Sequence, residues 1–332
     1  MTPRHKFSNQ SEKGSTISLE NIGNLRGGAY TNLSDLIRMR YAARGLNCFK
    51  SEAKLNRLSG LIASKSRGRG IDFAEVRIYQ PGDDIRSIDW KVTARTRQPH
   101  TKLFQEDKEC PFYIMVDQSI SMFFGSVYAF KSVLAAECAA LFSWDALYRG
   151  DRVGGIIFSE ECVTELRARR SKSSALRFLY ELNKFNRNLS KKPLRKTESH
   201  LSDALSRLRR ITKHDSTILI ISDFSALEEQ AILHLRQLMQ SSRVIGIHIS
   251  DPLEKELPKP DVYSVTDGAS KSRINTTSLK YRENYALQFN KRLDKVKNEF
   301  ARTRSPLVEL STEQKHVSEI ATAFGEMSQS VK

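Results

Sequence analysis

The side chains best suited to chemistry are an aspartate and two serines in the stretch "FYIMVDQSISM", residues 112–122. Asp117 follows five apolar or β-prone residues, and Ser119 and Ser121 stand at alternate positions after it. Alternate spacing turns these side chains toward one point where an extended strand becomes a loop. A carboxylate and two hydroxyls are hard oxygen donors, which suit Mg²⁺ or Mn²⁺ and suit zinc or copper poorly.

A second acid, Asp223, directly follows another apolar run, "STILIIS". If both runs are strands of a parallel sheet, both acids lie at carboxyl ends of strands, where such sheets bind ligands. A cation held by only two carboxylates keeps an open position, which a carboxylate of another molecule could fill. The alternative is a strand-end cap, in which the hydroxyls of Ser119 and Ser121 bond to backbone N–H groups.

From residue 110 onward, apolar runs and amphipathic stretches alternate, which predicts strands and helices in turn. Continuous apolar runs are typical of strands buried on both faces, as in parallel sheets. The predicted fold of residues 109–330 is therefore α/β, a doubly wound, mostly parallel sheet. Other predicted elements are a helix over 127–150 closed by Gly150, a hairpin of "RVGGIIFS" and "CVTELRA", a helix over 226–240, and a later helix with an apolar stripe of Tyr281, Tyr285, Phe289, Leu293, Val296 and Phe300.

The N-terminal third differs in character. Residues 1–30 are rich in Ser, Asn, Gly and Lys, which predicts disorder. Residues 31–108 predict a helix with Ser34 as its N-cap, followed by a small β segment with short strands around the turn "QPGDD". We therefore expect two parts, this N-terminal segment and the α/β unit over residues 109–330.

Composition limits the function classes. The 332 residues include four widely separated cysteines and no CxxC pair, which is typical of reduced thiols in the cytosol. No apolar run approaches the ~18 residues of a membrane span, and the first residues lack the apolar core of a secretory signal, so we expect a cytoplasmic location.

The net charge of +16 favours an anionic partner. Residues 165–196 carry eleven lysines and arginines against two acids, and residues 1–70 carry thirteen against four.

"DQSIS" resembles the metal-ion-dependent adhesion site of von Willebrand factor A domains. In that motif, DxSxS is followed by a threonine on a second loop and by an aspartate after a later strand, which Asp223 matches. The threonine position falls in "TESHLSDAL", where Ser199 occupies it by register and Thr197 lies two residues earlier. The resemblance implies Mg²⁺ (or Mn²⁺) held by Asp117, Ser119, Ser121, Ser199 or Thr197, and Asp223.

Longer motifs narrow the resemblance. "GRGIDFAEVRIYQPGDDIRSIDWKVTART", the DxSxSM strand and "YRGDRVGGIIFS" closely resemble domain-of-unknown-function family 58, over roughly residues 35–250. Its members look like adhesion-type A domains with an added N-terminal segment, and they tend to accompany AAA+ ATPases of the MoxR type. The resemblance implies a bacterial, chaperone-like adaptor that works with such an ATPase on a client complex and has no catalytic activity.

The sequence agrees with a non-enzymatic function. It contains no GxSxG elbow, no GxxxxGK[ST] phosphate loop and no HExxH motif. Phosphotransfer enzymes with an aspartyl nucleophile need a second carboxylate two residues on, and Ser119 stands there instead.

Two charged stretches leave alternatives open. "QPGDDIRSIDW" and the arginine after it favour an acid–arginine network that ties the N-terminal segment to the A-type unit, with a docking surface as the alternative; the residues are Asp83, Asp84, Arg86, Asp89, Trp90 and Arg95. The basic block 165–196 offers nucleic-acid binding as the alternative function. It lacks a recognisable reading motif, and Phe178, Tyr180 and Phe185 fall at core spacing on a helix, so the block equally suits an acidic ATPase ring.

Overall fold

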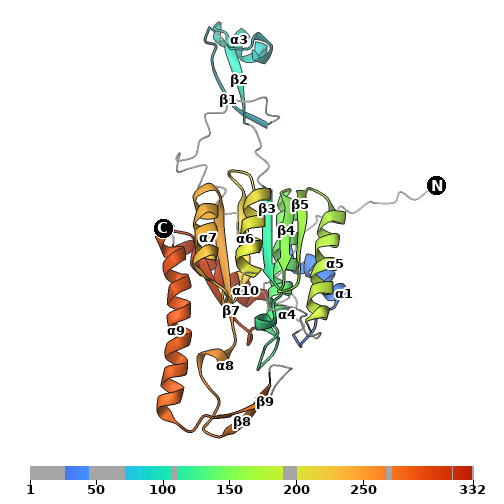
Figure 1. Ribbon diagram of the computed structural model, residues 1–332. Helices are drawn as coiled ribbons and strands as arrows, with labels where there is room; N and C mark the ends of the chain where they lie inside the picture. The colour runs from blue at the N-terminus through green and yellow to red at the C-terminus, as the bar shows by residue number, and fades with distance from the viewer. Residues whose placement is uncertain are drawn as a thin grey trace, which may run out of the picture.

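The centre of the molecule is a six-stranded sheet (Figure 1). The computed structural model describes residues 27–44, 72–81, 83–105, 111–189, 200–266, 271–315 and 317–330. The strand order is β10-β7-β6-β3-β4-β5, and every neighbouring pair is parallel except β4 and β5. The strands are β3 (Pro111–Asp117), β4 (Arg152–Phe158), β5 (Val163–Arg169), β6 (Thr217–Ser222), β7 (Arg243–Ser250) and β10 (Leu307–Ser311). The predicted doubly wound, mostly parallel sheet is confirmed.

Helices cover both faces of this sheet (Figure 1). One face packs against α1 (Leu33–Ala43), α4 (Lys131–Arg149), α5 (Lys172–Asn188) and α10 (Val317–Ser330). The other packs against α6 (His200–Ile211), α7 (Glu229–Ser241) and α9 (Leu279–Arg302). No helix in the described part of the chain is long and apolar enough to cross a membrane.

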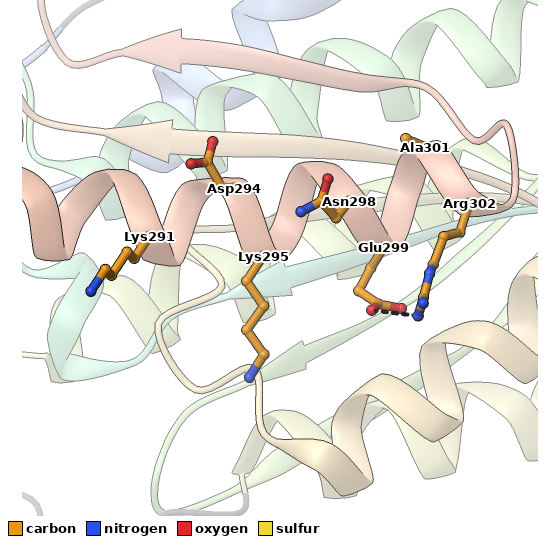
Figure 2. A pocket seen from close by; sticks show the side chains of 7 residues that line it. All are labelled: Lys291, Asp294, Lys295, Asn298, Glu299, Ala301 and Arg302. Carbon is orange, nitrogen blue, oxygen red and sulfur yellow. Dashed lines mark hydrogen bonds and ion pairs between the residues drawn. The ribbon is translucent and has the colours of Figure 1, made fainter.

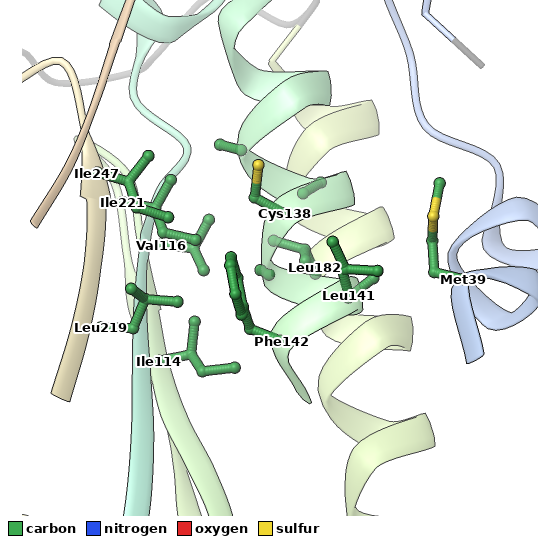
Figure 3. Packing of buried hydrophobic residues seen from close by; sticks show 14 of the residues in the cluster. Met39, Ile114, Val116, Cys138, Leu141, Phe142, Leu182, Leu219, Ile221 and Ile247 are labelled. Carbon is green, nitrogen blue, oxygen red and sulfur yellow. The ribbon is translucent and has the colours of Figure 1, made fainter. Parts of the chain in front are cut away.

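The side chains of β3 alternate between two hydrophobic clusters. Ile114 and Val116 belong to the cluster on the α4 side, where Figure 3 shows them facing Phe142. Tyr113 and Met115 belong to the cluster on the opposite face. Because successive side chains of a strand point to opposite faces, a strand buried on both sides must be apolar throughout. This burial explains the uninterrupted run before Asp117.

The strand β5 forms one edge of the sheet and differs from the others. Leu166 is buried, whereas Glu165, Arg167 and Arg169 are exposed. It pairs with β4 in the antiparallel sense, so the two form the hairpin that the sequence predicts. The opposite edge is β10, which has only five residues.

The first helix, α1, packs against the main sheet unit. Leu36 and Met39 belong to the α4-side cluster, and Trp144 Nε1 of α4 donates a hydrogen bond to the Leu36 carbonyl at 3.3 Å. The prediction of Ser34 as N-cap is wrong: the cap is Asn32, whose side chain accepts from the Ser34 N–H at 3.1 Å. A capping residue precedes the helix and keeps extended dihedral angles, as Asn32 does, whereas Ser34 already lies inside the helix.

The N-terminal β segment pairs β1 (Asp72–Ile78) with β2 (His100–Gln105) in the antiparallel sense. Between them lie the 3₁₀-helix η2 (Ile85–Ser87) and the short helix α3 (Trp90–Thr96), where the sequence predicts strands. Asp89 starts α3, because its carboxylate accepts from the Lys91 and Val92 N–H groups at 3.0 and 3.2 Å. A capped helix therefore interrupts the hairpin.

Several predicted boundaries and faces differ from the structure. α4 begins at Lys131 rather than at residue 127, and its end at Gly150 agrees with the prediction. Tyr180 is 55% exposed rather than buried, and on α9 the stripe is buried only from Phe289 onward. The insertion between β7 and α9 was not predicted; it contains α8 (Pro252–Lys255) and the antiparallel pair β8 (Val262–Thr266) and β9 (Lys271–Asn275).

Gly246 in β7 marks a close approach between the sheet and α9. A Cβ atom there would lie 2.5 Å from Cζ of Phe300 and 2.7 Å from Cδ1 of Leu307. We expect Gly246→Ala to lower the free energy of unfolding by about 1–3 kcal/mol in urea titrations, since a packed core resists added volume. Adding Phe300→Leu should make the double variant less costly than the sum of the single ones. An additive result would show that the Phe300 ring is not what makes a Cβ atom at position 246 unfavourable.

Candidate functional site

Asp117 lies at the carboxyl end of β3, next to the point where the strand order reverses between β3 and β6. Its side chain is buried, with 2% exposed. One oxygen, Oδ1, accepts from the Ser119 N–H at 2.9 Å, and Oδ2 accepts from the Ser222 hydroxyl at 2.6 Å. Each carboxylate oxygen has two lone pairs, so each keeps one acceptor position after these bonds.

Three serine hydroxyls gather beside this carboxylate. The Oγ atoms of Ser119 and Ser121 lie 3.0 Å apart, and Ser225 Oγ donates to Ser121 Oγ at 3.2 Å. The hydroxyls of Ser119 and Ser121 therefore contact other hydroxyls rather than backbone N–H groups. The Asp117 carboxylate at the end of β3 instead accepts hydrogen bonds from the Ser119 N–H and from the Ser222 hydroxyl. Ser225 was missed in the sequence, although it follows Asp223 by two residues, as Ser119 follows Asp117.

Asp223 lies just past β6 and forms an ion pair that the sequence did not predict. Its Oδ2 lies 2.8 Å from Nζ of Lys131, and its Oδ1 accepts from the Ser225 N–H at 2.9 Å. Lys131 is 1% exposed and also pairs with Glu254 of α8 at 2.5 Å. The lysine is the first residue of α4, where the helix dipole disfavours a positive charge, so the two carboxylates must compensate for both dipole and burial.

The two aspartates are in opposite electrostatic situations. Burial and the nearby charge of Asp223 together raise the pKa of Asp117 to about 6, although its hydrogen bonds to Ser119 and Ser222 act to lower it. Burial acts on Asp223 in the same direction, but Lys131 and the Ser225 hydrogen bonds outweigh it and lower the pKa of Asp223 to about 2. Burial would lower the pKa of Lys131, yet Asp223 and Glu254 hold it above its ordinary value.

The loop after Ser121 is fixed by another acid that follows a strand. Asp251, directly after β7, is fully buried. It accepts from the Ser126 N–H and hydroxyl at 2.7 and 2.6 Å and from the Thr312 hydroxyl at 2.5 Å. Asp251 was not predicted as a site residue, although an acid at the end of a buried strand is the signal that identified Asp117 and Asp223.

Polar contacts also hold the DxSxS loop from two sides. Glu160 accepts from the Ile120 N–H at 2.7 Å. Behind the loop, the buried Gln118 donates to the Ser132 carbonyl at 2.9 Å and accepts from Asn186 Nδ2 at 3.2 Å. A loop held at this many points is pre-organised, so its side chains need little rearrangement to meet a ligand.

The donor set suits a hard divalent cation. Asp117 supplies a buried carboxylate with spare acceptor positions, and Ser119 and Ser121 supply hydroxyls beside it. Within the described residues there is no group of three or more His, Cys, Asp or Glu that could hold a metal, so such a site depends on hydroxyls. Ser199 and Thr197 lie outside the described residues, so the loop ligand is not placed.

The predicted charged cluster of residues 83–95 is built locally. Asp83 pairs with Arg77 at 2.6 Å, and Asp84 caps η2 by accepting from the Arg86 N–H at 3.0 Å. Asp89 caps α3 and pairs with Lys102 at 3.6 Å. The side chains of these three acids thus make their contacts within the segment. Arg86, Trp90 and Arg95 are exposed.

The basic block is described only up to residue 189. Glu165 lies 3.5 Å from Arg207, and Lys184 lies 3.7 Å from Glu181, both as partly exposed pairs.

A shallow hollow on the outer side of α9 is lined mainly by charged side chains (Figure 2). There Glu299 already binds Arg236 at 2.7 Å, and Lys295 donates to the Leu227 carbonyl at 2.7 Å. None of the predicted site residues lines this hollow.

Residues 75–294 match the family described as "Protein of unknown function DUF58". The chain belongs to this family. An uncharacterized protein of Mycobacterium tuberculosis, Rv1480, is 32% identical over 193 residues, which are 58% of this chain and 58% of that protein. An uncharacterized protein of Bacillus subtilis, YeaD, is 34% identical over 70 residues, which are 21% of this chain and 16% of that protein. The match therefore spans 58% of the mycobacterial relative's length.

Solved structures give weaker likenesses to this DUF58 protein. BatB of Bacteroides thetaiotaomicron aligns with a TM-score of 0.37 and 14% identity, over 66% of this chain and 99% of that one. Manganese-loaded TRAP protein of Plasmodium vivax aligns with a TM-score of 0.28 and 14% identity, over 42% and 57% of the two chains. The strand order and the family membership support a von Willebrand factor A-like fold.

Proposed function

We propose that this DUF58 protein is a non-enzymatic protein-interaction adaptor that recognises a partner carboxylate through a divalent cation, Mg²⁺ or Mn²⁺. Asp117, Ser119 and Ser121 would hold the cation, with a hydroxyl from Ser199 or Thr197. Asp223 would contribute negative charge while it remains paired with Lys131. The cation would supply the positive charge that attracts the partner's acid.

The observation that carries this proposal is the uncompensated charge of Asp117. Its carboxylate is buried, its pKa is raised, and within the described residues no ion pair neutralises it. A buried carboxylate in this state is costly unless a cation joins it. Ser119 and Ser121 stand where additional oxygen ligands would be needed. Because Asp223 is already paired with Lys131, such a site would not fully neutralise a divalent cation, which would therefore still attract an outside carboxylate.

The partner part of the proposal follows from the family resemblance. It implies a MoxR-type AAA+ ATPase as the partner, an unknown client complex as the target, and a cytoplasmic adaptor that joins them. The net charge of +16 agrees with an acidic partner surface.

Asp117→Asn tests the cation. We expect it to weaken Mg²⁺ or Mn²⁺ binding at least tenfold in calorimetric titrations, because the amide lacks the negative charge, while the circular dichroism spectrum stays unchanged. The matched control is Asp294→Asn, which removes an exposed carboxylate on α9 and should bind the cation as the parent does. Equal affinity of Asp117→Asn and the parent would refute a site at Asp117.

Partner capture tests the adaptor function separately. Immobilised protein should retain a purified MoxR-type ATPase in Mg²⁺, and both EDTA and Asp117→Asn should abolish retention. A second capture, from cell lysate with and without nuclease treatment, distinguishes the alternative function. If the captured material is nucleic acid, and if capture ignores EDTA but ends with nuclease, the protein binds nucleic acid through its basic block instead.

A further inference from the structure

The N-terminal β segment has a defined backbone, and most of its described side chains are at least partly exposed. The Asp89 N–H donates to the His100 carbonyl at 2.8 Å, and Ile88 forms a bridge with Thr101. Among its described side chains, only that of Thr101 is buried. An isolated pair of strands is marginally stable in water, and stable ones pack an apolar face against something else. The segment therefore has apolar surface that another molecule could cover.

The two most exposed large apolar side chains described in this segment lie on η2 and α3. Ile85 is 65% exposed and Trp90 is 69% exposed, while the second tryptophan of the chain, Trp144, is 4% exposed. A large aromatic ring held on a short capped helix loses little freedom on binding, which is why tryptophan is frequent at the centres of interfaces.

Four exposed cations lie in the same stretch of η2 and α3 as Trp90. Arg86, Lys91, Arg95 and Arg97 are all exposed, and none forms an ion pair with another described residue. The acids of the same stretch are already used, because Asp83 pairs with Arg77, and Asp84 and Asp89 cap η2 and α3. The exposed face is therefore apolar and positive, although acids are frequent in its sequence.

The spacing of two of these cations is unfavourable for the helix itself. Lys91 and Arg95 are four residues apart on a helix of seven residues, so they lie on one face and repel each other. Lys91 also lies in the first turn, where the helix dipole disfavours a positive charge. An arrangement that costs local stability without a structural partner is typical of a binding site.

We propose that the exposed residues of η2 and α3 dock an acidic segment of a partner protein that places an apolar side chain against Trp90; the residues are Ile85, Arg86, Trp90, Lys91, Arg95 and Arg97. A second copy of the chain fits poorly, because the protein carries a net charge of +16. Nucleic acid fits less well than protein, because single strands are held by successive aromatic rings and the apolar companion here is an isoleucine. This inference is independent of the cation at Asp117.

A displayed library of random 12-residue peptides, selected on the 332-residue chain in EDTA, tests this proposal. We expect selected peptides to be rich in Asp and Glu around an aromatic or aliphatic residue, and to shift Trp90 fluorescence to the blue. Trp90→Ala should reduce their affinity at least tenfold. Lys91→Glu should also reduce it, although it replaces a repulsive pair with a favourable one and so should not destabilise α3.

Lys291→Glu, at a solvent-exposed position on α9, is the matched charge control and should bind the peptides as the parent does. Peptides without acidic enrichment, no selection above the Trp90→Ala background, or undiminished binding to Lys91→Glu would each overturn the proposal. It would also be overturned if a 12-nucleotide oligothymidylate bound more tightly than the peptides, or if concentrating the protein alone produced the blue shift.

Discussion

Replacing Lys131 with methionine is expected to lower the free energy of unfolding by about 3–5 kcal/mol, the usual cost of removing one partner from a buried ion pair. Lys131 is 1% exposed and lies 2.8 Å from Asp223 and 2.5 Å from Glu254. Methionine keeps much of the length of the side chain but leaves Asp223 buried without its cation. Urea titrations at neutral pH measure the loss.

Two comparisons show whether burial causes this effect. Lys297 pairs with Glu309 at 2.7 Å on the surface, so Lys297→Met should cost only about 0–1 kcal/mol. Adding Asp223→Asn and Glu254→Gln to Lys131→Met should recover part of the stability, because neither former partner of Lys131 then keeps an unpaired charge. If Lys131→Met cost no more than Lys297→Met, the buried pair would not be formed in solution.

Replacing His248 with phenylalanine is expected to flatten the acid limb of the stability profile. His248 is 4% exposed, its ring stacks at 6.4 Å from that of Phe224, and its Nδ1 has no hydrogen-bond partner among the described residues. Burial lowers the pKa of His248 from 6.5 to about 4. Between these values the unfolded chain binds a proton that the folded chain excludes, so stability falls as the pH falls from 6.5 toward 4.

The contribution of His248 over this window is about 3 kcal/mol, since each pKa unit corresponds to about 1.4 kcal/mol. Asp117 acts in the opposite sense. Its pKa in the folded chain, about 6, exceeds the ordinary 3.8, so this group stabilises the folded chain as the pH falls through that range. The change between pH 7 and pH 4.5 should thus be compared between variants, with urea titrations at each pH. His248→Phe and His248→Gln should both lose less stability than the parent, and a parallel loss in all three would exclude His248 as the cause.

The convergence of Asp117 and Asp223 could be predicted because parallel strands bring their carboxyl ends to one edge. Both aspartates follow apolar runs, and the structure places those runs as the neighbouring strands β3 and β6. The burial of both faces of each strand could also be predicted, since an uninterrupted apolar run must be covered on both sides.

Lys131 could not be predicted in the same way. In the sequence it is one lysine before a long apolar helix, and such a lysine usually reaches solvent. Its partners Asp223 and Glu254 come from distant parts of the chain, and the insertion that carries Glu254 was not predicted. Helix α3 was missed for a different reason: the strand-like alternation of residues 71–104 concealed a cap at Asp89, and a cap needs only one well-placed carboxylate.

The charged edge strand β5 has a consequence for how the protein meets other chains. An uncovered strand edge invites a strand of another molecule to pair with it, which leads to aggregation. Charges at Glu165, Arg167 and Arg169 oppose such strand addition at one end of the sheet, and the shortness of β10 opposes it at the other. Both edges of the sheet therefore disfavour the addition of a strand from another chain through backbone pairing.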